Sequence, residues 1–255
     1  MTEQTPVLVA RTVPMKFLPQ RIDGFPCNFV EQSVAKEVRL LTFSNRWNAV
    51  VFSLWAPVYD ALLKYHPVTA VRRKALSIAA SANARRVLLV GVGTGADLPI
   101  LATMQTELDV LVGIDLSTTM LSRSNRKATS LSLPFVSVCG DAQRLPLANQ
   151  AFDLVVLTLI VSVVPNPRTC VAEAMRVLQP GGRLVVLDKF LHGGHRPSVG
   201  RRILNFLTRP FGTDINRRWE DMGPEDAECQ VDEASGPANS IRLIILRKPI
   251  AASET

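Results

Sequence analysis

Runs of apolar residues alternate with apolar residues at helical spacing along residues 86–190, and this order predicts a sheet with helices between its strands. Unbroken runs of branched apolar residues predict buried strands at 86–90, 109–114, 135–139, 152–159 and 183–187. Apolar residues at helical spacing predict helices over 96–106, 117–130 and 168–178. Alternation of this kind is typical of a parallel sheet that carries helices on both faces.

The alternation stops after Phe190, and two candidate strands remain near the C-terminus. They lie at 228–234 and 241–247, joined by a short connection that contains Gly236 and Pro237. So short a connection predicts an antiparallel pair, because parallel neighbours need a longer crossover. The pattern therefore predicts a mostly parallel α/β sheet that ends in an antiparallel hairpin.

The first 80 residues follow a different pattern. Residues 1–35 are rich in proline and show no sustained period, which predicts an irregular N-terminal tail. Apolar residues, Trp47 and Trp55 among them, recur at helical spacing over 45–65, and residues 68–80 predict a further helix. The expected divisions are the tail at 1–35, an N-terminal helical cap at 36–80, the α/β core at 81–190, a basic insertion or lid at 191–222, and the hairpin at 223–250.

Charge is distributed unevenly and changes the picture of two segments. The net charge is +7, and residues 1–86 hold 12 Lys and Arg against five Asp and Glu, while residues 191–219 hold six against one. Such segments attract anionic partners, either nucleic acid or an acidic lipid surface, or they are simply solvated. An apolar, Trp-bearing helix with basic neighbours fits a membrane interface, and the alternative is that it only covers the core. The predicted substrate or membrane contacts are Trp47, Trp55, Arg201 and Arg202.

Several kinds of site and segment are not predicted. The four cysteines lie far apart without a C-x-x-C pair, so we expect neither a disulfide framework nor a metal site. The N-terminus lacks the apolar core of a signal peptide, and no run of 18 uncharged apolar residues predicts a membrane span. We expect a cytoplasmic protein, with peripheral membrane binding as an open alternative.

The candidate chemistry lies where the first three predicted strands end. Gly91, Gly93 and Gly95 follow the first strand, and glycine is needed where φ is positive or the backbone approaches a ligand. Asp115 ends the second strand, where it could accept both hydroxyls of a ribose; helix capping is the alternative. Asp141 ends the third strand, where it could accept from the amine of adenine or form a turn.

Five segments then resemble the class I S-adenosylmethionine-dependent methyltransferases. They are V-L-L-V-G-V-G-T-G at 87–95, G-I-D-L-S-x-x-M-L at 113–121, G-D-A-x-x-L-P at 140–146, F-D-L-V-V at 152–156 and R-V-L-Q-P-G-G-R-L at 176–184. The resemblance covers roughly residues 86–190 and implies a Rossmann-like seven-stranded, mostly parallel sheet with helices on both faces and an antiparallel C-terminal hairpin. It also implies S-adenosyl-L-methionine as cofactor. A nicotinamide dehydrogenase shares the glycine loop but not the Pro-Gly-Gly turn or the hairpin.

The expected cofactor contacts combine this resemblance with the strand ends. They are Gly91, Val92, Gly93, Gly95, Asp97, Asp115, Leu116, Asp141, Ala142 and Thr158. The family usually carries an acid where this chain has Leu89, so the amino group of the cofactor needs another partner here. Asp97 is one candidate, although an acid at a helix start is equally explained by capping.

The catalytic residues and the methyl acceptor are less determined. Tyr59 resembles the family's tyrosine that closes over the cofactor, and His192 is a candidate base that a solvated loop histidine would equally explain. W-A-P-V-Y-D at 55–60 and V-P-N-P at 164–167 resemble bacterial phospholipid N-methyltransferases, and the L-P-x-x-x-x-x-F-D spacing resembles quinone C-methyltransferases.

The implied function is N-methylation of a lipid such as phosphatidylethanolamine at the membrane surface. A soluble small-molecule or quinone methyltransferase is the alternative, with residues 191–219 as a lid. An alternative of another class is a non-catalytic protein that binds membrane or nucleic acid. Nucleic acid is the disfavoured partner, and no obligate protein partner is inferred.

Overall fold

The computed structural model describes residues 66–80, 84–104, 108–191, 197–208, 213–235 and 241–250. The strands are β1 Arg86–Val90, β2 Val110–Asp115, β3 Phe135–Cys139, β4 Phe152–Thr158, β5 Leu178–Asp188, β6 Glu228–Ser235 and β7 Ile241–Arg247. The helices are α3 His66–Ala80, α4 Leu98–Thr103, α5 Thr118–Ser130, α6 Pro167–Val177 and α7 Val199–Thr208, with a short 3₁₀ turn at Trp219–Asp221. The predicted tail at 1–35 and the predicted helix at 45–65 lie outside the described residues.

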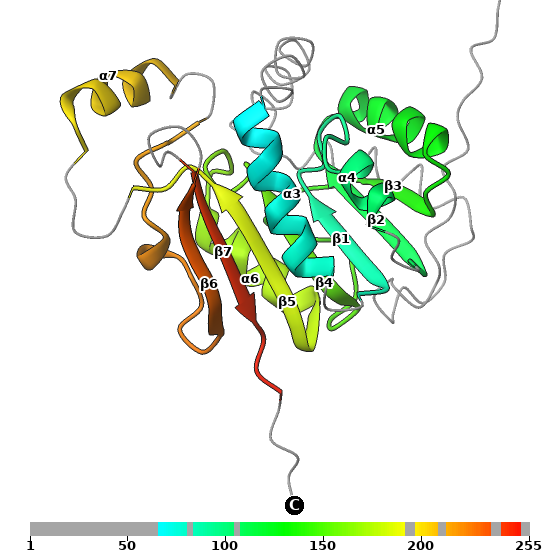
Figure 1. Ribbon diagram of the computed structural model, residues 1–255. Helices are drawn as coiled ribbons and strands as arrows, with labels where there is room; N and C mark the ends of the chain where they lie inside the picture. Colours follow the sequence, from blue (N-terminus) through cyan, green and yellow to red (C-terminus); the bar gives the residue numbers. More distant parts are fainter. Residues whose placement is uncertain are drawn as a thin grey trace, which may run out of the picture.

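The seven strands form one sheet in the order β3-β2-β1-β4-β5-β7-β6 (Figure 1). Strands β1 to β5 pair in parallel. Strand β7 pairs antiparallel with both β5 and β6, which confirms the predicted C-terminal hairpin. The chain therefore has the predicted α/β fold, a mostly parallel seven-stranded sheet of the Rossmann-like type.

Helices cover both faces of the sheet, as the alternating pattern predicted. Successive residues of a strand point to opposite faces, so β1 sends Leu88 into one apolar cluster and Leu89 into the other. The cluster around Leu88 includes Val171 and Ala174 of α6, and the cluster around Leu89 includes Leu76 of α3. Because both faces are packed, the carboxyl edge of the parallel strands is where a ligand can approach the backbone.

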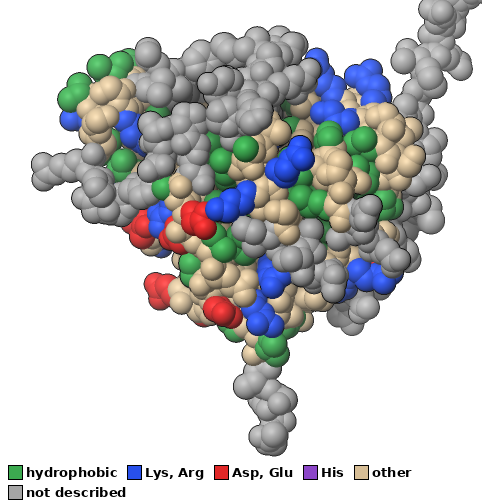
Figure 2. Space-filling model, viewed as in Figure 1, with side chains coloured by type: hydrophobic (Ala, Val, Ile, Leu, Met, Phe, Trp, Pro, Cys, Tyr) green, Lys and Arg blue, Asp and Glu red, His purple; other side chains and the backbone are tan. Residues whose placement is uncertain are grey.

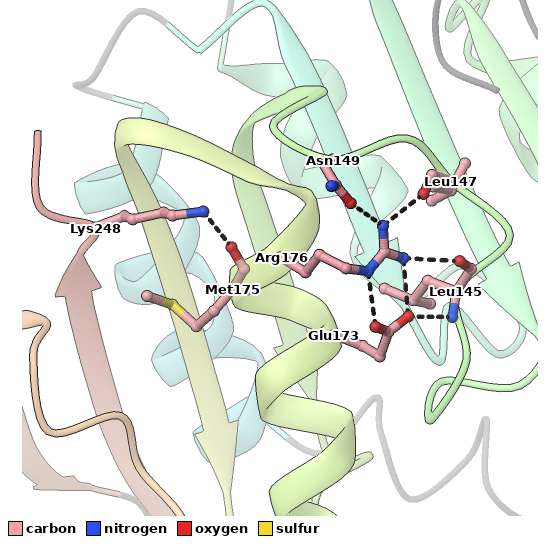
Figure 3. Close-up of polar contacts among 7 residues, drawn as sticks. All are labelled: Leu145, Leu147, Asn149, Glu173, Met175, Arg176 and Lys248. Carbon is pink, nitrogen blue, oxygen red and sulfur yellow. Dashed lines mark hydrogen bonds and ion pairs between the residues drawn. The ribbon is translucent and has the colours of Figure 1, made fainter. Parts of the chain in front are cut away.

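Strand β5 is longer than the sequence predicted. The Pro-Gly-Gly segment was expected to be a turn before a strand at 183–187, but β5 already begins at Leu178. Gly181 has a φ of +75°, and its N–H donates to the Lys248 carbonyl at 2.9 Å. The Lys248 ammonium also donates to the Met175 carbonyl at 2.6 Å (Figure 3). It donates to the Leu178 carbonyl at 2.7 Å as well. This lysine ties the end of β7 to the start of β5, so the segment joins the strand.

Two helices start at the carboxyl edge with side-chain caps. The Ser117 hydroxyl accepts from the Met120 N–H at 3.3 Å and caps the start of α5. The Asn166 side chain accepts from the Thr169 N–H at 3.2 Å and begins α6, with Pro167 in the first turn. Both caps fix loops that follow strands, and these loops border the site described next.

Candidate active site

A pocket opens at the carboxyl ends of β1, β2, β3 and β4. About 750 Å³ of space, part of it open to solvent, lies between its walls and its mouth. The sheet order 3-2-1-4 means that the chain leaves β1 to one side and later returns to the other, and ligands bind at such a switch point. Its lining residues are Gly91, Gly93, Ile114, Asp115, Leu116, Ser117, Met120, Gly140, Asp141, Ala142, Thr158, Leu159, Ile160, Val163, Val164 and Pro165.

The three glycines of the predicted loop have two different roles. All have positive φ, at +69° for Gly91, +54° for Gly93 and +74° for Gly95. A Cβ on Gly93 would meet no atom closer than 4.0 Å, so this position is open toward the pocket. A Cβ on Gly95 would lie 2.6 Å from the Leu98 side chain and 3.2 Å from Cα of Ser124. Gly95 therefore lets α4 and α5 approach each other and does not line the pocket.

Asp115 connects the second strand to the glycine loop. One of its carboxylate oxygens accepts from the Gly93 N–H at 2.8 Å, and the other accepts from the Ser117 N–H at 2.9 Å. Burial raises the pKa of Asp115, although the N–H groups of Ser117, Gly93 and Leu116 oppose this shift. A carboxylate offers about four acceptor positions. It can therefore hold the loop and still accept two hydroxyls from a bound ribose.

Asp141 is held by a residue that the sequence analysis did not single out. Its carboxylate accepts from the Gln143 backbone N–H at 2.9 Å and from the Gln143 side chain at 3.1 Å. The side-chain amide oxygen of Gln143 in turn accepts from the Asn166 backbone N–H at 2.8 Å. Gln143 thus joins the two loops that form opposite parts of the pocket wall. The turn geometry predicted as the alternative for Asp141 is present, and Asp141 lines the pocket as well.

Arg176 of α6 supports the loop that follows Asp141 (Figure 3). Its guanidinium donates to the carbonyls of Leu145 and Leu147, each at 2.9 Å, and to the Asn149 side chain at 2.6 Å. It also pairs with Glu173 at 2.7 Å, and Glu173 accepts from the Leu145 N–H at 2.7 Å. This network fixes the path of the loop from behind the pocket, which leaves Asp141 in a defined position.

Besides Gly95, two further expected cofactor contacts, Val92 and Asp97, lie away from the pocket lining. The Val92 N–H donates to the Ile114 carbonyl at 2.9 Å, and its side chain is buried in the apolar cluster beneath the loop. Asp97 faces Arg72 of α3, with Oδ1 3.7 Å from Nε, and both of these atoms are buried without a hydrogen bond. Leu89 is buried in the same cluster. The acid that the sequence suggested as a substitute is therefore paired with an arginine below the loop.

The remaining expected residues divide between the pocket and the rest of the chain. Leu116, Ala142 and Thr158 line the pocket. Tyr59, His192, Trp47 and Trp55 lie outside the described residues. Arg201 and Arg202 belong to α7: Arg202 is exposed, whereas the Arg201 guanidinium turns inward and donates to the Ile215 carbonyl. Arg202 therefore remains an expected surface contact, whereas Arg201 makes its hydrogen bond within the fold.

Sequence reasoning missed the apolar wall at 159–165. Leu159 has a φ of +56°, which is rare for a residue with a branched side chain, and it follows directly on β4. Ile160, Val163 and Val164 complete this wall. Behind it, the buried carboxylate of Asp188 accepts from the Ser162 N–H at 2.8 Å. The apolar residues carry no chemical signature of their own, so only their position beside β4 reveals them.

Comparisons with known proteins place this geometry in a family. Residues 88–186 match a family model described as a methyltransferase domain, and these residues contain the glycine loop, Asp115 and Asp141. A phosphatidylethanolamine N-methyltransferase from Cereibacter sphaeroides is 35% identical over 141 residues, which cover 54% of this chain and 66% of that protein. The chain carries a methyltransferase domain and is similar in sequence to S-adenosylmethionine-dependent methyltransferases. The methyltransferase domain is the part of the sheet that forms the pocket.

Two further comparisons define how far the likeness extends. A demethylmenaquinone methyltransferase from Thermus thermophilus is 34% identical to this methyltransferase over 141 residues, which cover 54% of this chain and 64% of that protein. The matched part thus spans less than two thirds of these relatives. The crystal structure of the [4+2]-cyclase SpnF superposes on this chain with a TM-score of 0.65 and 18% identity. The superposed part covers 80% of this chain and 96% of the SpnF chain. That structure shares the fold.

The residues of the pocket fit the cofactor of this family. S-adenosylmethionine presents a ribose diol, an adenine and a charged amino-acid end. Asp115 has acceptor capacity for the diol and Asp141 for the adenine amine, and apolar Leu116 and Ala142 line the same pocket, where they can contact the adenine ring. The positive φ angles of Gly91 and Gly93 turn the backbone toward the same space. Acceptors for the ribose hydroxyls and for the adenine amine are therefore present on the described residues.

Proposed function

We propose that this protein transfers the methyl group of S-adenosylmethionine to a membrane lipid, with the amine of phosphatidylethanolamine as the preferred acceptor. The observation that carries the proposal is the pocket at the switch point, where Asp115 and the glycine loop are hydrogen-bonded to each other. The similarity to a phosphatidylethanolamine N-methyltransferase supports the choice of acceptor.

The cofactor, when bound, supplies an electrophilic methyl group on a positively charged sulfur. The chain's own residues bind and orient it: Asp115 and Asp141 fix the nucleoside, and the rigid glycine loop sets the depth of the pocket. The wall formed by Leu159, Ile160 and Val163 excludes water from one side. These residues act by positioning and by exclusion of water, so the described part of the pocket needs no nucleophilic side chain.

The acceptor reaches the pocket from the side of the apolar wall. Val163, Val164 and Pro165 give this edge an apolar surface, which suits the aliphatic part of a lipid more than a charged metabolite. An amine acceptor is protonated in water and must lose a proton before it can attack. Tyr59 and His192, which lie outside the described residues, remain the proposed candidates for closing the site and accepting that proton.

Quinone ring methylation is the second candidate, and the similarity to a demethylmenaquinone methyltransferase favours it. Both candidates use a lipid, and they differ in the acceptor atom, nitrogen in one case and ring carbon in the other. A soluble small-molecule acceptor and a non-catalytic binding role are the remaining alternatives. Each enzymatic alternative predicts a different labelled product and the non-catalytic role predicts none, so one assay separates them.

The test is transfer of a radiolabelled methyl group from the cofactor to defined acceptors by the full-length protein. The acceptors are vesicles that contain phosphatidylethanolamine, vesicles with a demethylated quinone, and a lipid-free metabolite extract. We expect label in the phospholipid fraction, and none when Asp115→Asn replaces the wild type. Label only in the quinone or only in the soluble fraction refutes the phospholipid proposal. Cofactor binding without any labelled product supports the non-catalytic alternative.

A further inference from the structure

Helix α7 has the reverse of the usual polarity for a surface helix. Val199 is 73% exposed, Ile203 57% and Phe206 75%, whereas Asn205 is only 8% exposed. The three apolar residues are four and three positions apart, a spacing that places them on one face of the helix. A surface helix normally buries its apolar face and exposes its polar one. The outward apolar face of α7 therefore indicates an interaction surface.

Directed hydrogen bonds hold α7 in this orientation. The Asn205 side-chain oxygen accepts from the Ile215 N–H at 2.7 Å, and the Arg201 guanidinium donates to the Ile215 carbonyl. Burial lowers the pKa of Arg201. Turning the apolar face inward would break both contacts and leave the buried backbone groups of Ile215 unpaired. The exposure of the apolar face is therefore built into the fold.

A positive charge, that of Arg202, borders the apolar face of α7. Arg202 is exposed and lines the same shallow groove as Val199, Ile203 and Phe206. Residues 197–208 contain no Asp or Glu, and residues 191–219 hold six Lys or Arg against one acid. Figure 2 shows hydrophobic side chains gathered over α7 at one edge of the molecule, with Lys and Arg side chains beside them. Apolar side chains bordered by cations fit the interface of an anionic bilayer.

The segment that anchors α7 also contacts the wall of the pocket. Next to Ile215, the Asp214 N–H donates to the Ser162 carbonyl at 2.8 Å. The Arg217 guanidinium donates to the Val161 carbonyl in the same loop. In Figure 1, α7 lies at the end of the sheet toward which the β5 arrow points, which is the end that carries the pocket. A surface bound by α7 would therefore lie at the pocket end of the molecule.

We propose that α7 docks the protein on an anionic lipid bilayer, with Val199, Ile203 and Phe206 in the interface and Arg202 at the lipid phosphates. This inference deepens the proposed function and rests on it, since it supplies the surface on which a lipid acceptor is presented. No helix among the described residues is long and apolar enough to cross a bilayer. Binding through α7 is accordingly peripheral.

The test is flotation of the full-length protein with vesicles of phosphatidylcholine and phosphatidylglycerol, compared with phosphatidylcholine alone. Ile203→Ser combined with Phe206→Ser removes two apolar anchors and is expected to weaken binding at least about tenfold. Arg202→Gln is expected to weaken binding to anionic vesicles by roughly fivefold, with less effect in high salt. The matched control is Ile250→Ser, because Ile250 is also apolar and 68% exposed but lies outside α7.

Two readouts separate this inference from the proposed function. Affinity for S-adenosylhomocysteine, measured by calorimetry, should be unchanged in the α7 variants, which shows that they are folded. Methyl transfer to detergent-dispersed phosphatidylethanolamine should also persist, while transfer to vesicles falls. If the wild type methylates dispersed lipid but does not bind vesicles, the docking surface alone is overturned. The same holds if the α7 variants bind vesicles as well as the wild type does. A concentration-dependent dimer that Ile203→Ser abolishes, without vesicle binding, also overturns it. Absence of any labelled lipid overturns the proposed function instead.

Discussion

Replacing Asp115 by asparagine is the sharpest test of the cofactor pocket. The Asp115 carboxylate accepts from the Gly93 N–H at 2.8 Å and from the Ser117 N–H at 2.9 Å, and it lines the pocket. Asparagine has nearly the same shape, but one acceptor oxygen becomes an NH₂ donor. This donor must face either a backbone N–H or a ligand hydroxyl, so the variant loses acceptor capacity at the point where a diol would bind.

The expected loss of affinity follows from the hydrogen bonds involved. A hydrogen bond to a charged group contributes about 1.5–3 kcal/mol, and one to a neutral group contributes about 1 kcal/mol. Replacing two charged acceptors by one neutral acceptor therefore costs about 2–5 kcal/mol. The dissociation constant for S-adenosylhomocysteine should rise roughly 30- to 4,000-fold. Calorimetry measures it directly, because the product analogue undergoes no turnover.

The pH dependence of binding gives an independent check on the same residue. Burial raises the pKa of Asp115 above its ordinary value of 3.8. A raised pKa means that the carboxylate takes up its proton at a higher pH than a free aspartate does. On acidification, the affinity of the wild type should therefore begin to fall while the pH is still above 3.8. The affinity of Asp115→Asn should not show this fall, because asparagine does not titrate.

The control for Asp115→Asn is Asp109→Asn at the opposite end of the same strand. Asp109 forms an exposed ion pair with Arg85 at 2.8 Å, away from the pocket, so its variant should bind the cofactor product as the wild type does. If Asp115→Asn binds within threefold of the wild type while both variants unfold at the wild-type temperature, Asp115 is not the acceptor for the ribose.

Three further predictions concern the scaffold of the site. Arg176→Met should lower the free energy of unfolding by about 2–4 kcal/mol in urea, because the 145–149 loop loses its guanidinium donor. Burial raises the pKa of Glu173, but hydrogen bonds from Arg176 and a backbone amide outweigh it and hold this pKa below 4.5. The stabilising contribution of Glu173 is present above pH 4.5 and is lost as the pH falls through its pKa in the folded protein. Glu173→Gln should therefore make the unfolding temperature depend less on pH in the acid range. Gly95→Ala should destabilise the fold by about 1–3 kcal/mol because its Cβ would meet Leu98. Gly93→Ala should affect calorimetric cofactor binding more than stability.

The strands were predictable because their apolar runs have sharp ends. Strands 86–90, 135–139 and 241–247 have the bounds that the sequence predicted. Their neighbours are glycine, proline, serine or charged residues, which do not continue a buried strand. Helix α4 was predicted from residue 96 but begins at Leu98, after a turn in which Gly95 has a positive φ. Strand β5 was underestimated because its pairing depends on Lys248, which is distant in the sequence.

The site was predictable only where position along a strand determines position in space. Asp115 and Asp141 end neighbouring parallel strands, so their meeting at one edge follows from the topology. Asp97 is close to the glycine loop in sequence, but it starts a helix on the side of the sheet covered by α3, where it meets Arg72. Proximity in sequence to a binding loop therefore did not place Asp97 in the pocket. Gln143 was missed because its bridging role needs two loops that fold separately.

The orientation of α7 shows a limit of periodicity as a structural signal. The amphipathic pattern in residues 201–207 was visible in the sequence, but a pattern of this kind does not say which face meets the protein. The usual rule buries the apolar face, and here the contacts of Asn205 with Ile215 reverse it. A polar residue on an amphipathic helix can thus decide the orientation when a buried backbone segment needs its hydrogen bonds. The apolar face is then left for a partner outside the chain, and the surrounding basic residues favour an anionic surface.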